Sequence, residues 1–153
     1  SPTARATIVR WVTEWYETHI VFRYAGEDAP GEMPRYELGE LPEGFVENLE
    51  SQFVGTGMTA HFYENEKGDV ILFEYIYMQQ GSLSGVNTEN AYVISVIVND
   101  CEGLLVIPKE EDSNSMLMWL DPEHDLQFTL DAPLGQEDIL HMAESVHLVE
   151  TMK

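Results

Sequence analysis

The sequence predicts an α+β fold, a meandering and mostly antiparallel β-sheet of about eight strands packed by an N-terminal and a C-terminal helix. Short runs of β-branched and aromatic residues recur along the 153-residue chain, and sequences typical of turns separate them. Near the two ends, apolar residues instead follow helical spacing. No repeat, low-complexity tract or linker divides the chain, so residues 1–153 are predicted to form a single globular domain.

The N-terminal helix is predicted from a stripe of large apolar residues. Thr3 is a suitable N-cap, and the stripe that follows consists of Ile8, Trp11, Val12 and Trp15. Two tryptophans on one stripe are expected to dock the helix on the sheet. A helix in a membrane interface is the competing interpretation, but its polar face would be rich in Lys, whereas here Arg and Glu are mixed.

Extended segments follow this helix. Residues 20–24 and 35–38 have the branched and aromatic composition of strands, and Gly and Pro between them predict a loop. Residues 45–53 are predicted as a third strand. Their alternation of polar and apolar residues is imperfect, which favours an edge position or a bulge.

The middle of the chain predicts a β-hairpin followed by a long loop. Residues 58–64 and 69–77 flank the turn 65–68, and the second strand is apolar almost throughout, which is typical of a central strand covered on both faces. Residues 79–90 are rich in Gly and Ser and have few apolar anchors. Long loops of this kind are often functional, so this one is the candidate ligand or partner loop, with candidate residues Gln79, Gln80, Ser82, Ser84 and Asn87.

The last part of the chain predicts two more hairpins and the C-terminal helix. Residues 91–98 and 104–108 pair across the turn 99–103, and residues 116–120 and 126–130 pair across 121–125. The helix is expected from Gln136 to about Val146, with an apolar stripe of Ile139, Leu140, Met142, Ala143 and Val146. Trp119 and Phe128 are predicted to be core contacts against that helix.

Charge is the unusual feature of the composition. Seven Lys and Arg stand against 28 Asp and Glu, a formal net charge of −21. Such a chain repels phosphate backbones and anionic lipid, which argues against nucleic-acid binding; it favours solubility, or binding of cations or a basic partner.

The single cysteine, Cys101, excludes an intrachain disulfide and is predicted to be a small buried apolar residue rather than a nucleophile.

No motif predicts a catalytic, cofactor or metal site. The five histidines lack HxH and HExxH spacing, and the chain has no GxSxG elbow and no phosphate-binding glycine loop. Glu137 and Glu144 flank His141 on the C-terminal helix, a pattern that solubility alone explains. The acidic segments 65–69 and 110–114 supply oxygen ligands but do not fit a calcium-binding EF-hand loop.

Several short motifs in order resemble an uncharacterised family. They are Arg10 to Tyr16, Pro42-Glu43-Gly44-Phe45, Val98 to Gly103, Trp119-Leu120-Asp121 and His141 to Val146. Together they resemble a domain of unknown function at the C-terminal, extracytoplasmic end of membrane-anchored, anti-sigma-factor-like proteins of clostridial Firmicutes. The resemblance implies an upstream cytoplasmic segment and one spanning helix outside this chain, and it supplies no catalytic residues.

The resulting expectation is a non-enzymatic sensory or interaction domain, extracytoplasmic and attached to the cell membrane, that binds an extracellular ligand or partner protein. It is expected to bind no cofactor and no nucleic acid, and to meet the membrane only through the upstream helix. Two alternatives stay open. One is a secreted or surface hydrolase that uses scattered acids and a histidine such as His61 or His141, and the other is a calcium-dependent surface binding module.

Overall fold

The computed structural model describes residues 9–15, 18–26, 33–78 and 83–149, and its main element is an eight-stranded antiparallel sheet. Seven strands follow one another across this sheet, and β5 (Phe53–Val54) also pairs with β6 at one edge. The order is β4 (Val46–Glu47), β6 (Met58–Glu64), β7 (Val70–Tyr77), β12 (Leu126–Ala132), β11 (Ser115–Asp121), β10 (Cys101–Pro108) and β9 (Ala91–Val98).

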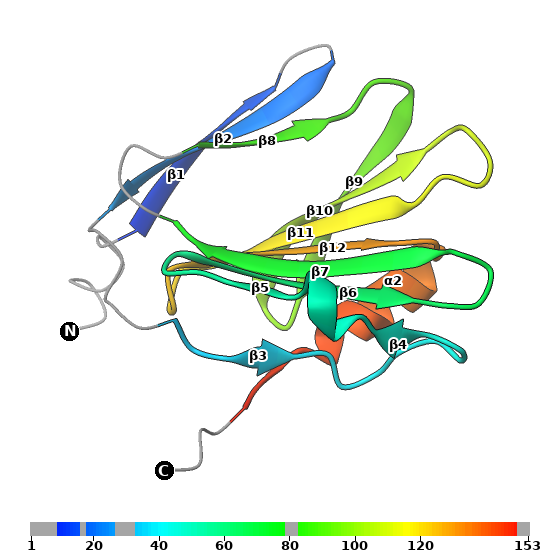
Figure 1. Cartoon of the computed structure of the whole chain (residues 1–153). Coiled ribbons are helices and arrows are strands. Elements are labelled where there is room, and N and C mark those ends of the chain that lie inside the picture. The colour runs from blue at the N-terminus through cyan, green and yellow to red at the C-terminus, as the bar shows by residue number, and fades with distance from the viewer. Residues whose placement is uncertain (1–8, 16–17, 27–32, 79–82, 150–153) are drawn as a thin grey trace.

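Two smaller sheets accompany it. A three-stranded antiparallel sheet consists of β1 (Val9–Trp15), β2 (His19–Gly26) and β8 (Leu83–Asn87), with β2 in the middle. A two-stranded sheet joins β3 (Tyr36–Glu37) to β13 (His147–Leu148). The three-stranded sheet lies over one face of the large sheet, and the helix α2 (Gln136–Glu144) lies against the other (Figure 1).

The core has two layers, one on each face of the large sheet, because successive side chains along a strand point to opposite faces. In β11, Leu117 and Trp119 belong to the core beneath α2, whereas Met118 and Leu120 belong to the core beneath the three-stranded sheet. Successive side chains of a strand point to opposite faces, so one strand with apolar residues at every position supplies both layers. The large sheet is therefore covered on both faces along β10 and β11.

The predicted contact between the C-terminal hairpin and helix is confirmed. Trp119 and Phe128 are 4% and 3% exposed and stack with ring centroids 5.2 Å apart. They share one core with the three buried residues of α2, Ile139, Met142 and Ala143. The helix ends at Glu144, and Ser145 caps it.

The predicted N-terminal helix is wrong. Residues 9–15 form strand β1, which pairs with β2 from Val9↔Gly26 to Trp15↔Ile20. Thr3 and Ile8, two of the residues used for that prediction, lie outside the described residues. β-Branched and aromatic residues suit a strand at least as well as a helix, and the neighbouring strand supplies the hydrogen bonds that decide between them. The fold is accordingly β-rich, with α2 as the α-helix of the described residues.

Three other boundaries differ from the sequence-based prediction. The strand predicted at 45–53 is at the sheet edge, as expected, but the 3₁₀-helix η1 (Leu49–Ser51) divides it into β4 and β5. The predicted loop 79–90 contains strand β8, which pairs with β2. The turn predicted at 99–103 is shorter, because Val98 pairs with Cys101 across Asn99 and Asp100, whose φ angles of 47° and 69° make a tight hairpin turn.

The central hairpin is confirmed, with one correction to its environment. β6 and β7 pair from Met58↔Ile76 to Glu64↔Val70, and β7 lies between β6 and β12. On one face of β7, the side chains of Ile71, Phe73, Tyr75 and Tyr77 are buried. On the other face, those of Leu72, Glu74 and Ile76 are half-buried. The prediction of complete cover on both faces therefore holds for one face only.

Candidate functional site

A hollow lies between the three-stranded sheet and the large sheet. It has a volume of about 310 Å³. Its described lining comes from five strands: Trp15 of β1, Phe22 of β2, Ser95, Val96 and Ile97 of β9, Glu102, Gly103 and Leu104 of β10, and Met118 and Leu120 of β11. We call this hollow the inter-sheet cleft.

The inner end of the inter-sheet cleft is apolar and buried. Phe22, Leu104, Met118 and Leu120 are all at most 8% exposed and belong to the core beneath the three-stranded sheet. Leu104 and Met118 are register partners on β10 and β11, so both point to the same face of the sheet. The strand pairing therefore builds a continuous apolar floor.

The rim of the inter-sheet cleft is exposed and mixed in character. Trp15 and Ile97 are each 60% exposed, and Ser95 and Glu102 are also exposed. Glu102 is the register partner of Ile97 and is the ionisable residue of the described lining. An exposed Trp and Ile beside a buried apolar floor are typical of a binding surface rather than of a solvated face.

A buried hydrogen bond fixes the three-stranded sheet to the large sheet. The hydroxyl of Tyr24 on β2 donates to Oε1 of Gln127 on β12, and both residues are at least 95% buried. Burial raises the pKa of Tyr24 above its usual range, so the hydroxyl stays protonated and able to donate. This contact links β2 of the three-stranded sheet to β12 of the large sheet.

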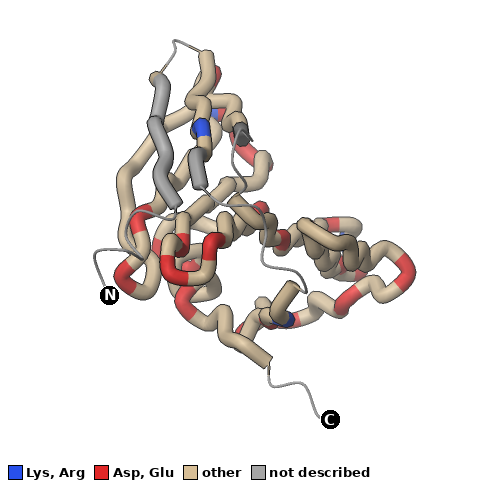
Figure 2. Tube along the Cα trace, turned by 90° about the vertical axis from the view of Figure 1, so that its left-hand side faces the viewer, with Lys and Arg blue, Asp and Glu red and all other residues tan. Residues whose placement is uncertain are grey.

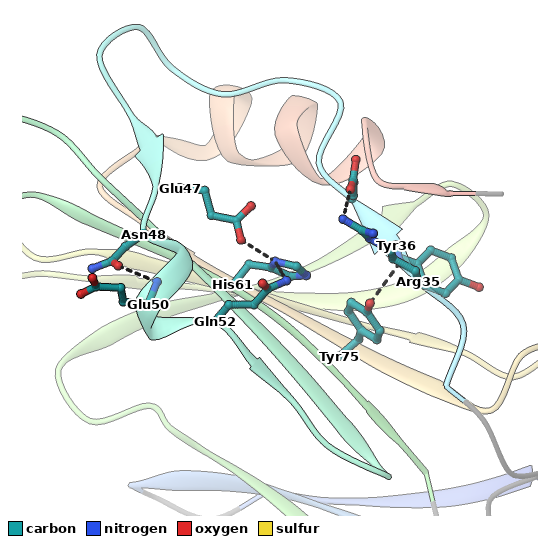
Figure 3. Close-up of polar contacts among 9 residues, drawn as sticks. Arg35, Tyr36, Glu47, Asn48, Glu50, Gln52, His61 and Tyr75 are labelled. Carbon is teal, nitrogen blue, oxygen red and sulfur yellow. Dashed lines mark hydrogen bonds and ion pairs between the residues drawn. The ribbon is translucent and has the colours of Figure 1, made fainter. Parts of the chain in front are cut away.

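A second polar cluster surrounds His61 on β6 (Figure 3). His61 is 2% exposed, and its Nδ1 lies 3.0 Å from Oε2 of Glu47, a residue of β4. Gln52, which follows η1, points toward the same ring, with its Nε2 3.4 Å from Nδ1. The other ring nitrogen, Nε2, is buried without a hydrogen-bond partner. The cluster joins the edge segment 46–54 to the sheet.

A second hollow, beside α2, brings one histidine together with two carboxylates. It has a volume of about 220 Å³, and its lining includes Glu40, Asp138 and His141. Nδ1 of His141 lies 2.8 Å from Oε2 of Glu40, and both side chains are more than half exposed. The described lining contains no Ser, Thr or Cys that could act as a nucleophile.

The candidate loop residues are only partly placed. Gln79, Gln80 and Ser82 lie outside the described residues. Ser84 and Asn87 belong to strand β8, where Ser84 pairs with Phe22, a residue that lines the inter-sheet cleft. The Asn87 side chain is used locally, because its Oδ1 accepts a hydrogen bond from Glu89 N at 2.9 Å.

The acidic segments considered for calcium are held by their own hydrogen bonds. Oδ1 of Asn65 accepts from the backbone N–H groups of Lys67 and Asp69, and Asn114 donates through Nδ2 to Asp131. Among the described residues, no group of three or more His, Cys, Asp and Glu is arranged to hold a metal ion.

The residues that form the inter-sheet cleft were not identified from the sequence. The sequence predicts a helix at Trp15, a strand at Ile97 and a turn at Glu102, and it predicts no functional role for any of the three. The available signal was the strand 91–98, which is apolar at almost every position although β9 lies at the sheet edge. An apolar edge strand requires a covering element or a ligand.

Comparison with known proteins gives one match. A family described as a domain of unknown function (DUF4367) matches residues 35–146. No curated protein and no solved structure matches the chain. In the described part of the chain, no helix has the length and apolar character that crossing a membrane requires.

Proposed function

The chain belongs to the DUF4367 family of domains of unknown function, and from this membership and the inter-sheet cleft we propose that it is a non-enzymatic sensory domain that binds a small ligand between its two sheets. The observation that carries the proposal is the combination of an exposed Trp15 and Ile97 with a buried apolar floor. A volume of about 310 Å³ is at the lower end of the range for small-molecule sites, so the ligand is small.

We further propose that the full-length protein is a membrane-anchored, anti-sigma-factor-like regulator and that this domain lies outside the cytoplasm. Two observations support this context: the motif resemblance in the chain and the strong negative charge, which keeps a domain away from an anionic membrane surface. Acidic residues are spread over several turns and strands, whereas basic residues are few (Figure 2). Ligand binding between β1 and β9–β10 would change how the three-stranded sheet packs and so bias the attached regulator.

The binding test uses a neutral apolar dye whose fluorescence increases in apolar surroundings, such as Nile red. We expect saturable binding to the protein. Ser95→Phe places a large side chain at the rim without removing a core residue, and it is expected to weaken binding about tenfold or more. Ser113→Phe, at an exposed loop position away from the lining, is the matched control and is expected to bind as the wild type does. Equal binding by both variants would place the dye elsewhere and contradict the proposal.

The regulatory part of the proposal is tested in the full-length protein. Ser95→Phe is expected to abolish the response of a sigma-dependent reporter to its inducing condition, while Ser113→Phe leaves the response intact. A normal response with Ser95→Phe would separate the inter-sheet cleft from signalling.

The hollow at His141 supports a second candidate function, that of a hydrolase. His141 and Glu40 form a histidine–carboxylate pair, which is a common general-base arrangement. Turnover of a chromogenic ester, glycoside or phosphomonoester that is lost in His141→Gln and retained in His124→Gln would favour this function. Absence of turnover in the wild type would leave the binding function as the better account.

A further inference from the structure

We propose that the ligand of the inter-sheet cleft is a small organic cation with an apolar body, that is, a quaternary ammonium or protonated amine attached to an alkyl or aryl group. This inference rests on the proposed function and names the chemistry of its ligand. It follows from three properties of the described lining: its charge, its aromatic rim and its apolar floor.

The charge of the lining selects a cation. Glu102 is exposed at the rim, and the described lining contains no Lys, Arg or His that could neutralise it or pair with an anion. A bound anionic group would lie near an uncompensated carboxylate, whereas a cation would pair with it. The net charge of −21 adds a long-range field of the same sign, which draws cations toward the protein and repels anions.

The aromatic rim adds a second contact for a cation. Trp15 is 60% exposed and lines the same cleft as Glu102. The face of an indole ring attracts cations more strongly than that of any other side chain, and sites for quaternary ammonium groups commonly combine such rings with a carboxylate. The chain already shows this type of contact on β9, where Nζ of Lys109 lies 5.0 Å from the ring centroid of Tyr92.

The floor of the inter-sheet cleft fits an apolar body rather than a second polar group. Phe22, Leu104, Met118 and Leu120 are buried there, and their side chains offer no hydrogen-bond donor and only the weakly accepting sulfur of Met118. A polar tail would be desolvated there without compensating hydrogen bonds, which disfavours its binding. The geometry therefore orients the ligand with its apolar part inward and its cationic part at Trp15 and Glu102.

The test compares two amphiphiles of equal chain length, octyltrimethylammonium and octyl sulfate, below their micelle-forming concentrations and in about 0.15 M NaCl to screen the general field of the protein. Binding is measured by calorimetry and by displacement of Nile red. We expect the cation to bind about tenfold or more tightly than the anion. Glu102→Gln is expected to remove most of this preference, although it changes only one of the many formal charges.

The control for charge is Glu66→Gln, in the exposed turn between β6 and β7, which removes the same charge away from the cleft and is expected to retain the preference. Trp15→Leu keeps an apolar rim and is expected to weaken binding of the cation while Nile red still binds. An equal loss of preference in Glu102→Gln and Glu66→Gln would show that the general field selects the cation, and would overturn the inference.

The outcomes also separate this inference from the proposed function. Saturable Nile red binding that Ser95→Phe blocks, together with equal affinity for the two amphiphiles, would retain the binding function and reject the cationic ligand. Absence of saturable binding by the dye and by both amphiphiles would reject both. Preferential binding of the cation that depends on Glu102 and Trp15 would establish the ligand class.

Discussion

His61 is buried in an aromatic setting that satisfies only one of its two ring nitrogens. Nδ1 meets the Glu47 carboxylate, while Nε2 is buried without a partner between the neighbouring rings of Tyr63 and Phe73. A buried imidazole normally finds partners for both nitrogens, because an unpaired buried polar atom costs free energy. Through Glu47 and Gln52, the His61 ring adds a side-chain contact to the strand pairing that holds the edge segment 46–54 against the sheet.

We expect His61→Ala to lower the free energy of unfolding by about 2–4 kcal/mol, because it opens a cavity beside Phe73 and leaves Glu47 without its partner. Denaturant melts followed by circular dichroism measure the change. His147→Ala, at an exposed histidine, is the matched control and is expected to change stability by less than about 0.5 kcal/mol. Similar small losses in both variants would contradict the anchoring role of His61.

Cys101 has the properties of a packed residue rather than of a nucleophile. It is half-buried against the core beneath α2, and burial raises the pKa of its thiol to about 11, with Asp121, Asp100 and Glu123 adding to the effect. The thiolate is the reactive form of cysteine. A raised pKa therefore suppresses reactivity near neutral pH.

Alkylation of Cys101 by iodoacetamide at about pH 8 is expected to be at least about tenfold slower in the folded protein than in the protein unfolded by urea. Mass spectrometry follows the rate. The pKa of the Cys101 thiol is higher in the folded protein than the value of 9.0 for the unfolded chain, so folding disfavours ionisation of the thiol. The stability that Cys101 contributes is therefore present below pH 9.0 and is lost as pH rises toward 11. Equal rates in the folded and unfolded protein would contradict the suppression of the thiol by burial.

At the scale of elements, the motifs that carry the family resemblance have structural roles. Asn99 and Asp100 form the tight turn of the β9–β10 hairpin, and Gly103 faces Trp119, where a Cβ atom would lie 2.8 Å from the backbone oxygen of Met118. Ser145 accepts hydrogen bonds through Oγ from the backbone N–H groups of Gly39 and Glu40. The motifs therefore mark the fold, and they also contain four residues of the cleft lining, Trp15, Glu102, Gly103 and Leu120.

The contact of the C-terminal hairpin with α2 depends on Trp119. We expect Trp119→Ala to lower the free energy of unfolding by about 3–5 kcal/mol, because the buried ring fills the space between Phe128 and the helix. Trp15→Ala, at a tryptophan that is 60% exposed, is the matched control, with an expected loss of about 1 kcal/mol or less. A Trp119→Ala protein that kept its melting temperature would contradict the core assignment.

At the scale of the whole molecule, the large negative charge opposes folding. Glu74, on the half-buried face of β7, shows this locally, because burial and the nearby Asp131 raise the pKa of its carboxyl group. The folded state therefore binds the Glu74 proton more tightly than the unfolded state does. Ionisation of Glu74 lowers stability as pH rises from the acidic range through the raised pKa.

We expect Glu74→Gln to raise the melting temperature at pH 7, because the amide removes a buried charge and its repulsion from Asp131 without changing the shape of the side chain. The gain is expected to shrink as pH falls, since Glu74 in the wild type then becomes protonated. Glu66→Gln, which is exposed, is the control and should change the melting temperature little. A gain that is independent of pH would contradict the electrostatic explanation. Calorimetry across pH 4–8, a range around the ordinary carboxyl pKa, measures the difference.

Sequence patterns alone predict the hairpins β6–β7, β9–β10 and β11–β12, the helix α2 and the core pair Trp119–Phe128. These features depend on local sequence patterns that extend over only a few residues. The patterns are the turn residues, the alternation of apolar side chains along a strand, and their recurrence about every 3.6 residues along a helix. The same local information left the fate of residues 9–15 undecided, because tryptophans and β-branched residues suit both a helix and a strand.

In the folded chain β1 and β8 flank β2, and this small sheet covers one face of the large one, an arrangement that no sequence pattern predicts. The inter-sheet cleft is a consequence of that packing. Trp15 lies far along the chain from the β9–β10 hairpin that carries Ile97 and Glu102, and no local pattern relates it to them. Hydrogen bonds between strands and the burial of their apolar faces depend on residues that are distant in the sequence. The individual elements could therefore be predicted from local patterns, whereas the candidate site, which forms where elements pack, could not.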